Sequence, residues 1–411
     1  MLKKDRMFYK FSLYGFLKNL RFFDPFMILF FREVGLSFFE IGSLLAIRDL
    51  STNFLEIPTG IYADAFGRRR SMIMAFVSYI VSFAIFYFFS SFAMYTLAMF
   101  LFAFGDAFRS GTHKALILEY LKLKHMEDVK VEYYGHTRAA SQLGSAISSL
   151  IAAALVFYSG SYRYIFIASV IPYVLDLINL STYPKELDGK LMKIQRGAIL
   201  NQIKVTLKSF FEIFSSREAI RAILNSSIFS SFFKVTKEYL QPIVRNFALS
   251  IPIFVAMSGV KRSSVVIGIV YFSIYLLTSY ASRNASKFSK KFKNLPMAIN
   301  LTFLFGTVFL ILSGISAHYD LRLLSIILFL ILYVLQNLRR PMNVSFISDK
   351  ISHKTMASGL SVESQFTTIS MAIMAMVMGA LADSLGVGFA LMIVGMIMFP
   401  LTFVLKVGER T

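Results

Sequence analysis

The sequence contains no cysteine and no tryptophan, and acidic residues are few: 23 Asp and Glu stand against 43 Lys and Arg in 411 residues. Without cysteine the chain can form no disulfide, no zinc–thiolate site, no iron–sulfur cluster and no thiolate nucleophile. Without tryptophan, an aromatic belt at a membrane interface has to use tyrosine. These absences exclude several classes of enzyme and metalloprotein, although they leave the redox compartment open.

Charged residues of both signs are also scarce, at 16% of the chain, whereas apolar residues make up 56%. A soluble domain has roughly 25% charged and 45–50% apolar residues, so this chain is too apolar to be one. A net charge of +20 is often a sign of nucleic-acid binding. Here the basic residues are spread along the chain and are not concentrated in one soluble segment, which argues against it. We therefore expect a membrane protein with no nucleic-acid partner.

Hydrophobic segments long enough to cross a bilayer, which takes about 20 largely apolar residues, occur twelve times. The longest polar interruption divides them six and six. This division predicts an N-terminal six-helix bundle over residues 1–181, a cytoplasmic linker with a short amphipathic helix over 182–217, and a C-terminal bundle over 218–411. The predicted spans are 8–31, 37–59, 71–90, 92–120, 137–158, 162–181, 218–245, 263–281, 295–315, 321–348, 357–383 and 387–405.

Basic residues concentrate in alternate loops, and this asymmetry predicts the orientation. With the N-terminus in the cytoplasm, the predicted inner loops and termini hold 26 of the 43 Lys and Arg, and the outer side holds six. Because positive charge is retained on the cytoplasmic side, we predict a plasma-membrane protein with both termini in the cytoplasm. The first apolar run continues to Phe31 without a small-residue cleavage site, which favours a retained span over a signal peptide.

Ionisable residues inside the predicted spans recur with a period of three spans. The first, fourth, seventh and tenth spans carry many of them, whereas the third, ninth and twelfth carry none. Charges within a span normally face protein or water. The pattern therefore predicts an all-α membrane protein with two pseudo-symmetric six-helix bundles, whose first and fourth helices line a central cavity. Repeated bundles around a midplane site are typical of secondary transporters.

A glycine-containing basic segment, GIYADAFGRRR, begins at Gly60. Gly60 and Gly67 permit a tight turn and close helix contact, and Asp64 can cap a neighbouring helix N-terminus. Arg68 and Arg69 can anchor the inner face or pair with carboxylates. The simpler alternative is a short positive-inside loop.

As a string, this segment resembles the loop signature of the major facilitator superfamily, G-x-x-x-D-[RK]-x-G-R-[RK], and departs from it at Ala65, where a base is usual. The resemblance extends to the twelve spans, the basic central loop and the inner termini. It implies the major facilitator fold and an ion pair between the motif arginine and Glu119. It also implies that Asp64 latches the loop to the start of the eleventh span, near Ser358 and Gly359, and so stabilises an outward-open state.

Four charged residues and a histidine in the N-terminal half are candidates for the substrate or proton pathway. Arg21 lies one turn before Asp24 in the first span, and Asp106, Arg109 and His113 share a face of the fourth. These groups can carry protons or bind a substrate. Structural ion pairs, and a hydrogen-bonded packing role for the histidine, are the alternatives.

The C-terminal half has basic candidates with few acidic neighbours. Lys234 and Arg339 lack an obvious set of carboxylate partners, which favours a substrate that supplies the negative charge. Lys234 can instead pair with Glu238 four residues later. Glu363 in the eleventh span is a second candidate proton site.

Taken together, these features predict a secondary active transporter that moves a small molecule across the plasma membrane by alternating access, coupled to protons or another ion. Export is left open as its direction. A multidrug pump for lipophilic cations is the first alternative to an organic-anion or zwitterion carrier, and an uncoupled uniporter or sensor is the second. The sequence has no HExxH, GxSxG or phosphate-loop motif, so we predict no enzyme activity and no cofactor. The expected partners are the substrate, the coupling ion and membrane lipids, and the expected state is a monomer.

Overall fold

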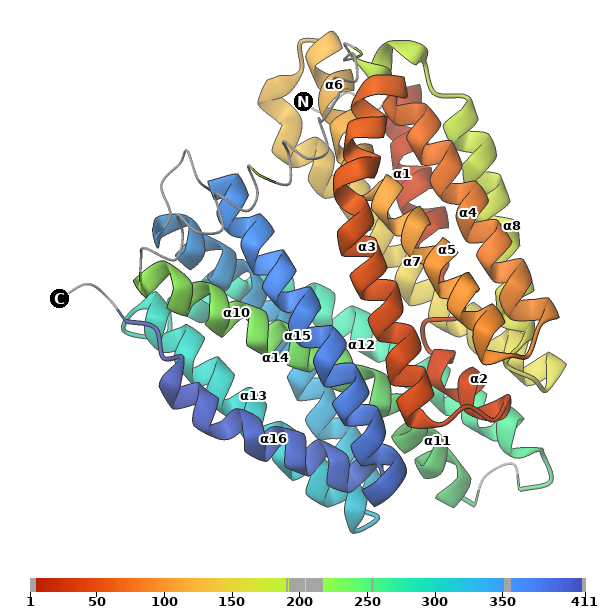
Figure 1. Ribbon diagram of the computed structural model, residues 1–411, viewed down its shortest axis with the longest axis vertical. Helices are drawn as coiled ribbons and strands as arrows, with labels where there is room; N and C mark the ends of the chain where they lie inside the picture. The colour runs from red at the N-terminus through yellow and green to blue at the C-terminus, as the bar shows by residue number, and fades with distance from the viewer. Residues whose placement is uncertain are drawn as a thin grey trace. The chain divides into compact units, whose positions relative to one another are not determined.

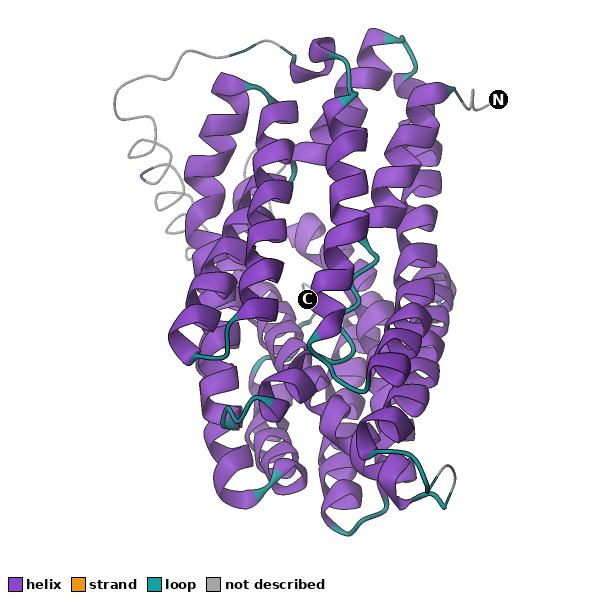
Figure 2. Cartoon of the chain, turned by 90° about the vertical axis from the view of Figure 1, so that its right-hand side faces the viewer, coloured by secondary structure: helices purple, strands orange, loops and turns teal. Residues whose placement is uncertain are grey.

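The computed structural model describes residues 5–189, 191, 204, 217–252, 255–350 and 356–408, without the side chains of 131, 349–350 and 356–360. Every regular element in these ranges is helical (Figure 2). Most of the predicted linker, with its amphipathic helix, lies outside the described residues, whereas its first residues up to Gly189 are described. The α-helices are α1 (Arg6–Lys18), α2 (Met27–Glu33), α3 (Phe38–Phe66), α4 (Arg68–Phe88), α5 (Phe92–Arg109), α6 (Thr112–Leu123), α7 (Lys130–Ser159), α8 (Tyr164–Ser181), α10 (Arg217–Thr236), α11 (Leu240–Ser250), α12 (Gly259–Ser289), α13 (Leu295–His318), α14 (Arg322–Lys350), α15 (Met356–Leu385) and α16 (Val387–Val404), with 3-10 turns η1 (Glu127–Val129), η2 (Lys185–Asp188) and η3 (Lys237–Tyr239).

Nine helical segments of the described chain are long and apolar enough to cross a membrane, with α5 and α6 forming one of them. The three remaining predicted spans are polar or interrupted. The first is divided into α1 and α2 by turns around Pro25, which lacks a backbone N–H. The seventh is divided into α10, η3 and α11, and the second is the long, charge-bearing helix α3.

The first of two compact units comprises Met1–Phe30, Ile47–Gln202 and Ile267–Phe272. Within it α4 packs along α5 and α8, and α1 packs along α7 and α8 (Figure 1). An aromatic cluster joins α8 to α2 and α4. The ring of Phe166 in α8 lies 4.6 Å from that of Phe30 in α2 and 4.8 Å from that of Phe86 in α4. Gly268 of α12 also belongs to this unit. The α12 backbone passes so close to Ala153 of α7 that any side chain at position 268 would overlap it.

The second unit comprises Phe31–Ala46, Ile203–Val266 and Ser273–Thr411. Within it α13 packs along α14 and α16, and α10 packs along α15 (Figure 1). The division differs from the predicted bundle boundaries, because the first turns of α3 belong with the C-terminal helices.

Close backbone contact and a carboxylate cap explain that placement of α3. A methyl group on Gly42 would overlap the carbonyl oxygen of Ala375, and one on Gly379 would overlap that of Phe38. The two carboxylate oxygens of Asp383 accept hydrogen bonds from the backbone N–H groups of Phe38 and Phe39, both at 2.8 Å. An acidic group at a helix N-terminus satisfies unpaired donors and complements the helix dipole. The start of α3 is therefore fixed to α15 by shape and by charge.

The same Gly-to-Ala substitution should have opposite effects at two helical positions. Gly42→Ala forces a methyl group into the α15 backbone and should destabilise the protein by about 1–3 kcal/mol, the usual cost of overpacking. Gly135→Ala in α7 meets open space and should be neutral or stabilise by up to about 1 kcal/mol through helix propensity. Thermal unfolding of the two variants in one detergent compares them. A Gly42→Ala protein as stable as Gly135→Ala would contradict the close contact.

Candidate functional site

A break in the predicted fourth span shapes the candidate site. The predicted span over 92–120 is confirmed as one segment, Phe92–Leu123, but its helix is interrupted, because α5 ends at Arg109 and α6 begins at Thr112. Gly111 between them has φ +71°, in the left-handed region that glycine adopts without strain. The break turns the residues on either side of it toward α1 and α7.

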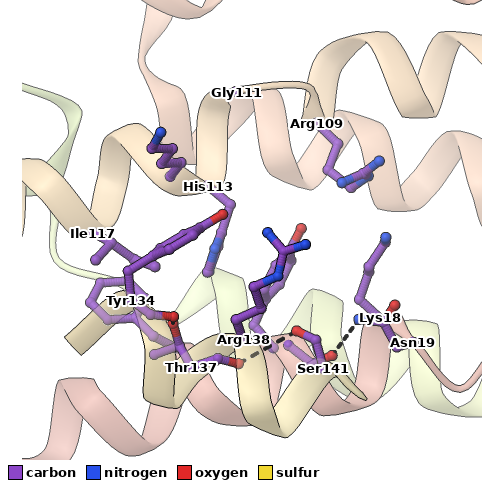
Figure 3. A pocket seen from close by; sticks show the side chains of 14 residues that line it. Lys18, Asn19, Arg109, Gly111, His113, Ile117, Tyr134, Thr137, Arg138 and Ser141 are labelled. Carbon is purple, nitrogen blue, oxygen red and sulfur yellow. Dashed lines mark hydrogen bonds between the residues drawn. The ribbon is translucent and has the colours of Figure 1, made fainter. Parts of the chain in front are cut away.

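A cavity of about 200 Å³ lies at this break, lined by residues of α1, α5, α6 and α7. Four of the fourteen lining residues are Lys or Arg, and none of the fourteen is Asp or Glu. Figure 3 shows the nitrogen ends of Lys18, Arg109 and Arg138 turned toward the same space. Lys18 and Arg109 are half-buried, whereas Lys114 and Arg138 are exposed at the rim. We call this cavity, with these four basic residues, the cationic pocket.

Aromatic rings form one wall of the cationic pocket. The ring of Tyr14 stacks on the imidazole of His113, with centroids 3.6 Å apart and 16° between the planes, and Phe11 contacts that imidazole edge-on at 5.5 Å. The Tyr183 hydroxyl lies 3.5 Å from His113 Nε2. Burial raises the pKa of Tyr183 well above its usual range, so it presents a neutral hydroxyl to the imidazole. His113 is thus held in place by its neighbours at the edge of the cavity.

A network of ion pairs stands beside the pocket and brings together four predicted pathway residues. Asp106 Oδ1 accepts hydrogen bonds from the Tyr79 hydroxyl at 2.5 Å and from Arg109 Nη2 at 3.0 Å, and lies 3.7 Å from Arg21 Nη2. Arg21 Nη1 lies 3.9 Å from Asp24 Oδ2. Charge-assisted bonds of this kind fix side-chain geometry. Asp106 therefore positions Arg109 at the pocket wall while balancing the two arginines.

The glycine and arginine motif joins several elements of the first unit. Gly67, with φ +106°, is the one-residue turn between α3 and α4, and a methyl group on it would lie 2.7 Å from the Asp188 carboxylate. Asp188 accepts a 2.8 Å hydrogen bond from the Arg69 backbone N–H, and the Arg69 guanidinium donates to the Tyr183 carbonyl at 3.1 Å. Arg68 Nη1 lies 3.6 Å from Glu119 Oε2, the pair that the resemblance implies.

The remaining latch residues face outward. Gly60 and Asp64 are both exposed on the last turns of α3, and nothing surrounds the position of a Gly60 side chain. The implied partners of Asp64, Ser358 and Gly359, lie among the residues without described side chains. A latching role for Asp64 thus stays a prediction, whereas the helix-capping role that the sequence suggested for it is performed at α4 by Asp188.

Arg339, a predicted pathway residue, lies within the helix packing of the second unit, and its role as a substrate contact stays a prediction. It is fully buried and donates to the carbonyl oxygens of Ile299 and Asn225, to the Asn225 amide oxygen and, at 3.1 Å, to the Thr302 hydroxyl. Its guanidinium carbon lies 4.5 and 5.0 Å from the ring centres of Phe229 and Phe303. Carbonyl groups and ring faces take the place of a carboxylate here. The arrangement cross-links α14 with α10 and α13.

The other two C-terminal candidates lie in separate places. Glu363 Oε1 accepts a 2.5 Å hydrogen bond from the Ser226 hydroxyl between α15 and α10. Lys234 is exposed at the end of α10. Glu238, which the sequence offered as its partner, lies 3.2 Å from the Nζ of the adjacent Lys237 in η3.

Sequence reasoning did not single out Arg138, Tyr134 or Asp188. Arg138 follows Thr137 at the predicted inner end of the fifth span. A basic residue at such a position is explained by the preference of positive charge for the cytoplasmic side. Asp188 lies in the predicted linker, just past a proline-containing turn. Only the break at Gly111 and the fold of the first unit bring these residues to their partners.

Comparison with known proteins gives consistent matches. The model of the Major Facilitator Superfamily matches residues 13–362. An uncharacterized MFS-type transporter, YxaM of Bacillus subtilis (strain 168), is 33% identical over 107 residues, and the match spans 26% of either chain. Among solved structures, a point mutant of the nucleoside transporter NupG has a TM-score of 0.77 at 14% identity over 98% of both chains. A D-xylose–proton symporter has a TM-score of 0.69 at 15% identity over 98% of both chains.

Removing the Asp188 carboxylate should loosen the junction of α4, α8 and η2. Asp188→Ala deletes the acceptor for the Arg69 backbone N–H and should cost about 1 kcal/mol, as for other helix caps. Glu186→Ala, an exposed acidic residue of the same turn, is the matched control and should change stability by less than about 0.5 kcal/mol. The melting temperatures of the two variants check this. Equal melting temperatures would show that the cap does not stabilise the fold.

Proposed function

Since the chain belongs to the major facilitator superfamily, we propose that it is a proton-coupled secondary active transporter of a small organic anion, working by alternating access. Family membership makes it a multi-pass membrane transporter and not an enzyme. The observation that carries the substrate class is the cationic pocket, whose lining includes Lys18, Arg109, Lys114 and Arg138 and no acidic residue.

Charge balance favours an anion in this pocket. Basic groups brought close together inside a membrane protein are costly unless an anion compensates them. Arg21 and Arg109 are balanced by Asp24 and Asp106, so the network beside the pocket has no negative charge left over for Lys18, Lys114 and Arg138. Carboxylate and phosphate groups match the planar donor fork of arginine. A cavity of about 200 Å³ restricts the occupant to a small molecule.

A lipophilic-cation pump needs the opposite arrangement, with a carboxylate facing an apolar cavity. Two carboxylates beside the pocket, Asp24 and Asp106, are engaged with Arg21 and Arg109. A cation in the pocket would lie beside positively charged side chains. This repulsion raises the free energy of cation binding and so selects against cationic ligands. This geometry supports the anion carrier over the multidrug alternative.

The proposed setting is the plasma membrane, with both termini in the cytoplasm and the chain acting as a monomer. The excess of Lys and Arg in alternate loops supports this orientation. In it, most of the pocket-lining residues belong to the cytoplasmic halves of the predicted first, fourth and fifth spans. A solved structure of the same fold is titled a D-xylose–proton symporter, and this supports the proton as the coupling ion over the uncoupled uniporter.

Ligand-induced stabilisation tests the substrate class. Purified protein should be stabilised by oxalate, citrate or phosphoenolpyruvate and not by tetraphenylphosphonium, because bound ligand shifts the unfolding equilibrium. Lys114→Gln should weaken anion binding roughly tenfold, equivalent to about 1.4 kcal/mol. Lys122→Gln removes the same charge from the same helix outside the pocket and should bind as the wild type does. Stabilisation by the lipophilic cation alone would rule out the anion carrier.

The absence of native cysteine allows a direct test of orientation. Lys124→Cys in a predicted inner loop should react with a membrane-impermeant maleimide only after cells are permeabilised. Leu321→Cys, exposed at the outer end of the predicted tenth span, should react in intact cells. The reverse labelling pattern would invert the proposed topology.

A further inference from the structure

Between Tyr173 and Asn179, one face of α8 carries a polar residue at every third position and lies against α1. The Tyr173 hydroxyl donates to the Lys18 carbonyl at 3.3 Å, and the Asn179 side-chain amide donates to the Lys10 carbonyl at 3.1 Å. Residues three apart share a helix face. Asp176, midway between these two residues, therefore faces α1 midway between Lys10 and Lys18, at the level of Tyr14.

Asp176 is a buried carboxyl group with little compensation from its surroundings. Its side chain is fully buried. Oδ1 accepts one long hydrogen bond of 3.3 Å from Asn179, and Oδ2 has no hydrogen-bond partner within the described chain. Asp106, by contrast, has three donors or cations on one oxygen. A buried carboxylate without donors is costly, and adding a proton removes the charge.

The other candidate carboxyl groups lack this combination. Asp24 is about one-third exposed and lies beside Arg21. Asp106 is held by two arginines and a tyrosine. Glu363 accepts the Ser226 hydroxyl in the second unit. Asp176 alone among these four is both fully buried and left with an oxygen that the described chain does not satisfy.

Two residues of α1 connect Asp176 with the cationic pocket. Tyr14 faces Asp176 across the α1–α8 contact and stacks on His113 at the pocket wall. Lys18 lines the pocket and is the cation that acts electrostatically on Asp176. One ammonium group is thus shared between a buried carboxyl and the space where the anion would bind.

We propose that Asp176 is the proton-binding site of this transporter and that it is loaded together with the anion. A bound anion takes over the charge of Lys18. Asp176 then loses its compensating cation, and Oδ2 accepts one proton from water; the proton returns to water when the anion leaves. Anion and proton therefore move in the same direction. This inference rests on the proposed anion-transport function.

Other titratable groups surround this position and set its response to pH. They are Tyr14 and Lys18 from α1, Tyr183 beyond the end of α8, His113 from α6 through its contacts with both tyrosines, and Tyr79 from α4 through its ring contact with Tyr173. Lys18 is the one charged side chain among those that act on Asp176 directly.

The test measures protons taken up when an anion binds. Oxalate is the probe, because its own carboxyl groups stay ionised near neutral pH. Added to weakly buffered, purified full-length protein, oxalate should withdraw about one proton per bound molecule from solution, and its Kd should change by up to about tenfold per pH unit. Asp176→Asn should still bind oxalate, but with no proton uptake and a Kd independent of pH. Asp320→Asn, an exposed carboxyl in an outer turn, is the matched control and should behave as the wild type does.

Proton uptake by Asp176→Asn equal to that of the wild type would overturn the proposal. Should that variant fail to fold, infrared difference spectra of the wild type and Asp176→Glu decide instead. The carbonyl band of a protonated carboxyl that appears with oxalate should shift in Asp176→Glu, and an unshifted band overturns the assignment. If the wild type binds no anion, the proposed function fails. Spectra recorded across a pH jump without ligand then test Asp176 by the same band shift.

Discussion

Positive charge without matching negative charge is the constraint on which this structure depends. Ionised groups within a membrane protein need partners, water or a ligand, since hydrocarbon provides none. In the first unit Asp24 and Asp106 balance Arg21 and Arg109, whereas Lys18, Lys114 and Arg138 line the cationic pocket, whose lining includes no acidic residue. The break at Gly111 brings the end of α5 and the start of α6 to that cavity. Under the proposed anion transport, the fold, the ion pairs and the pocket together hold cationic groups where an anion would bind.

The second unit deals with a buried cation differently. Arg339 has carbonyl and hydroxyl acceptors on two helices and lies against two phenylalanine rings. Its charge is dispersed over dipoles and π-faces, and no cavity is needed. The two halves of the chain share a fold and a pattern of polar spans, yet the candidate substrate groups lie in the first unit and the internal cross-link in the second. The superficial equivalence of Arg109 and Arg339 in the sequence therefore does not extend to their surroundings.

Much of the fold could be predicted from composition and periodicity. The fold class and the exclusion of an enzyme are confirmed by the family match and by the solved structures of the same fold. Helical spacing alone was enough to place Asp106 beside Arg109 and Arg21 beside Asp24. The local break at Gly111 was not predicted: Ser110-Gly111 is a dipeptide typical of turns, but the polar residues around it were interpreted as cavity-lining positions of one span. The surroundings of Arg339 and Asp176 depend on which neighbouring helix covers them, and this is a tertiary property.

The position of a bound anion tests this account most directly. Crystals of the protein grown with selenate can be examined at the selenium absorption edge, where anomalous scattering from selenium locates the anion. The account predicts an anomalous peak within hydrogen-bond distance of the Lys18, Arg109 and Arg138 nitrogen atoms. Peaks confined to exposed lysines, with none in the cationic pocket, would contradict it.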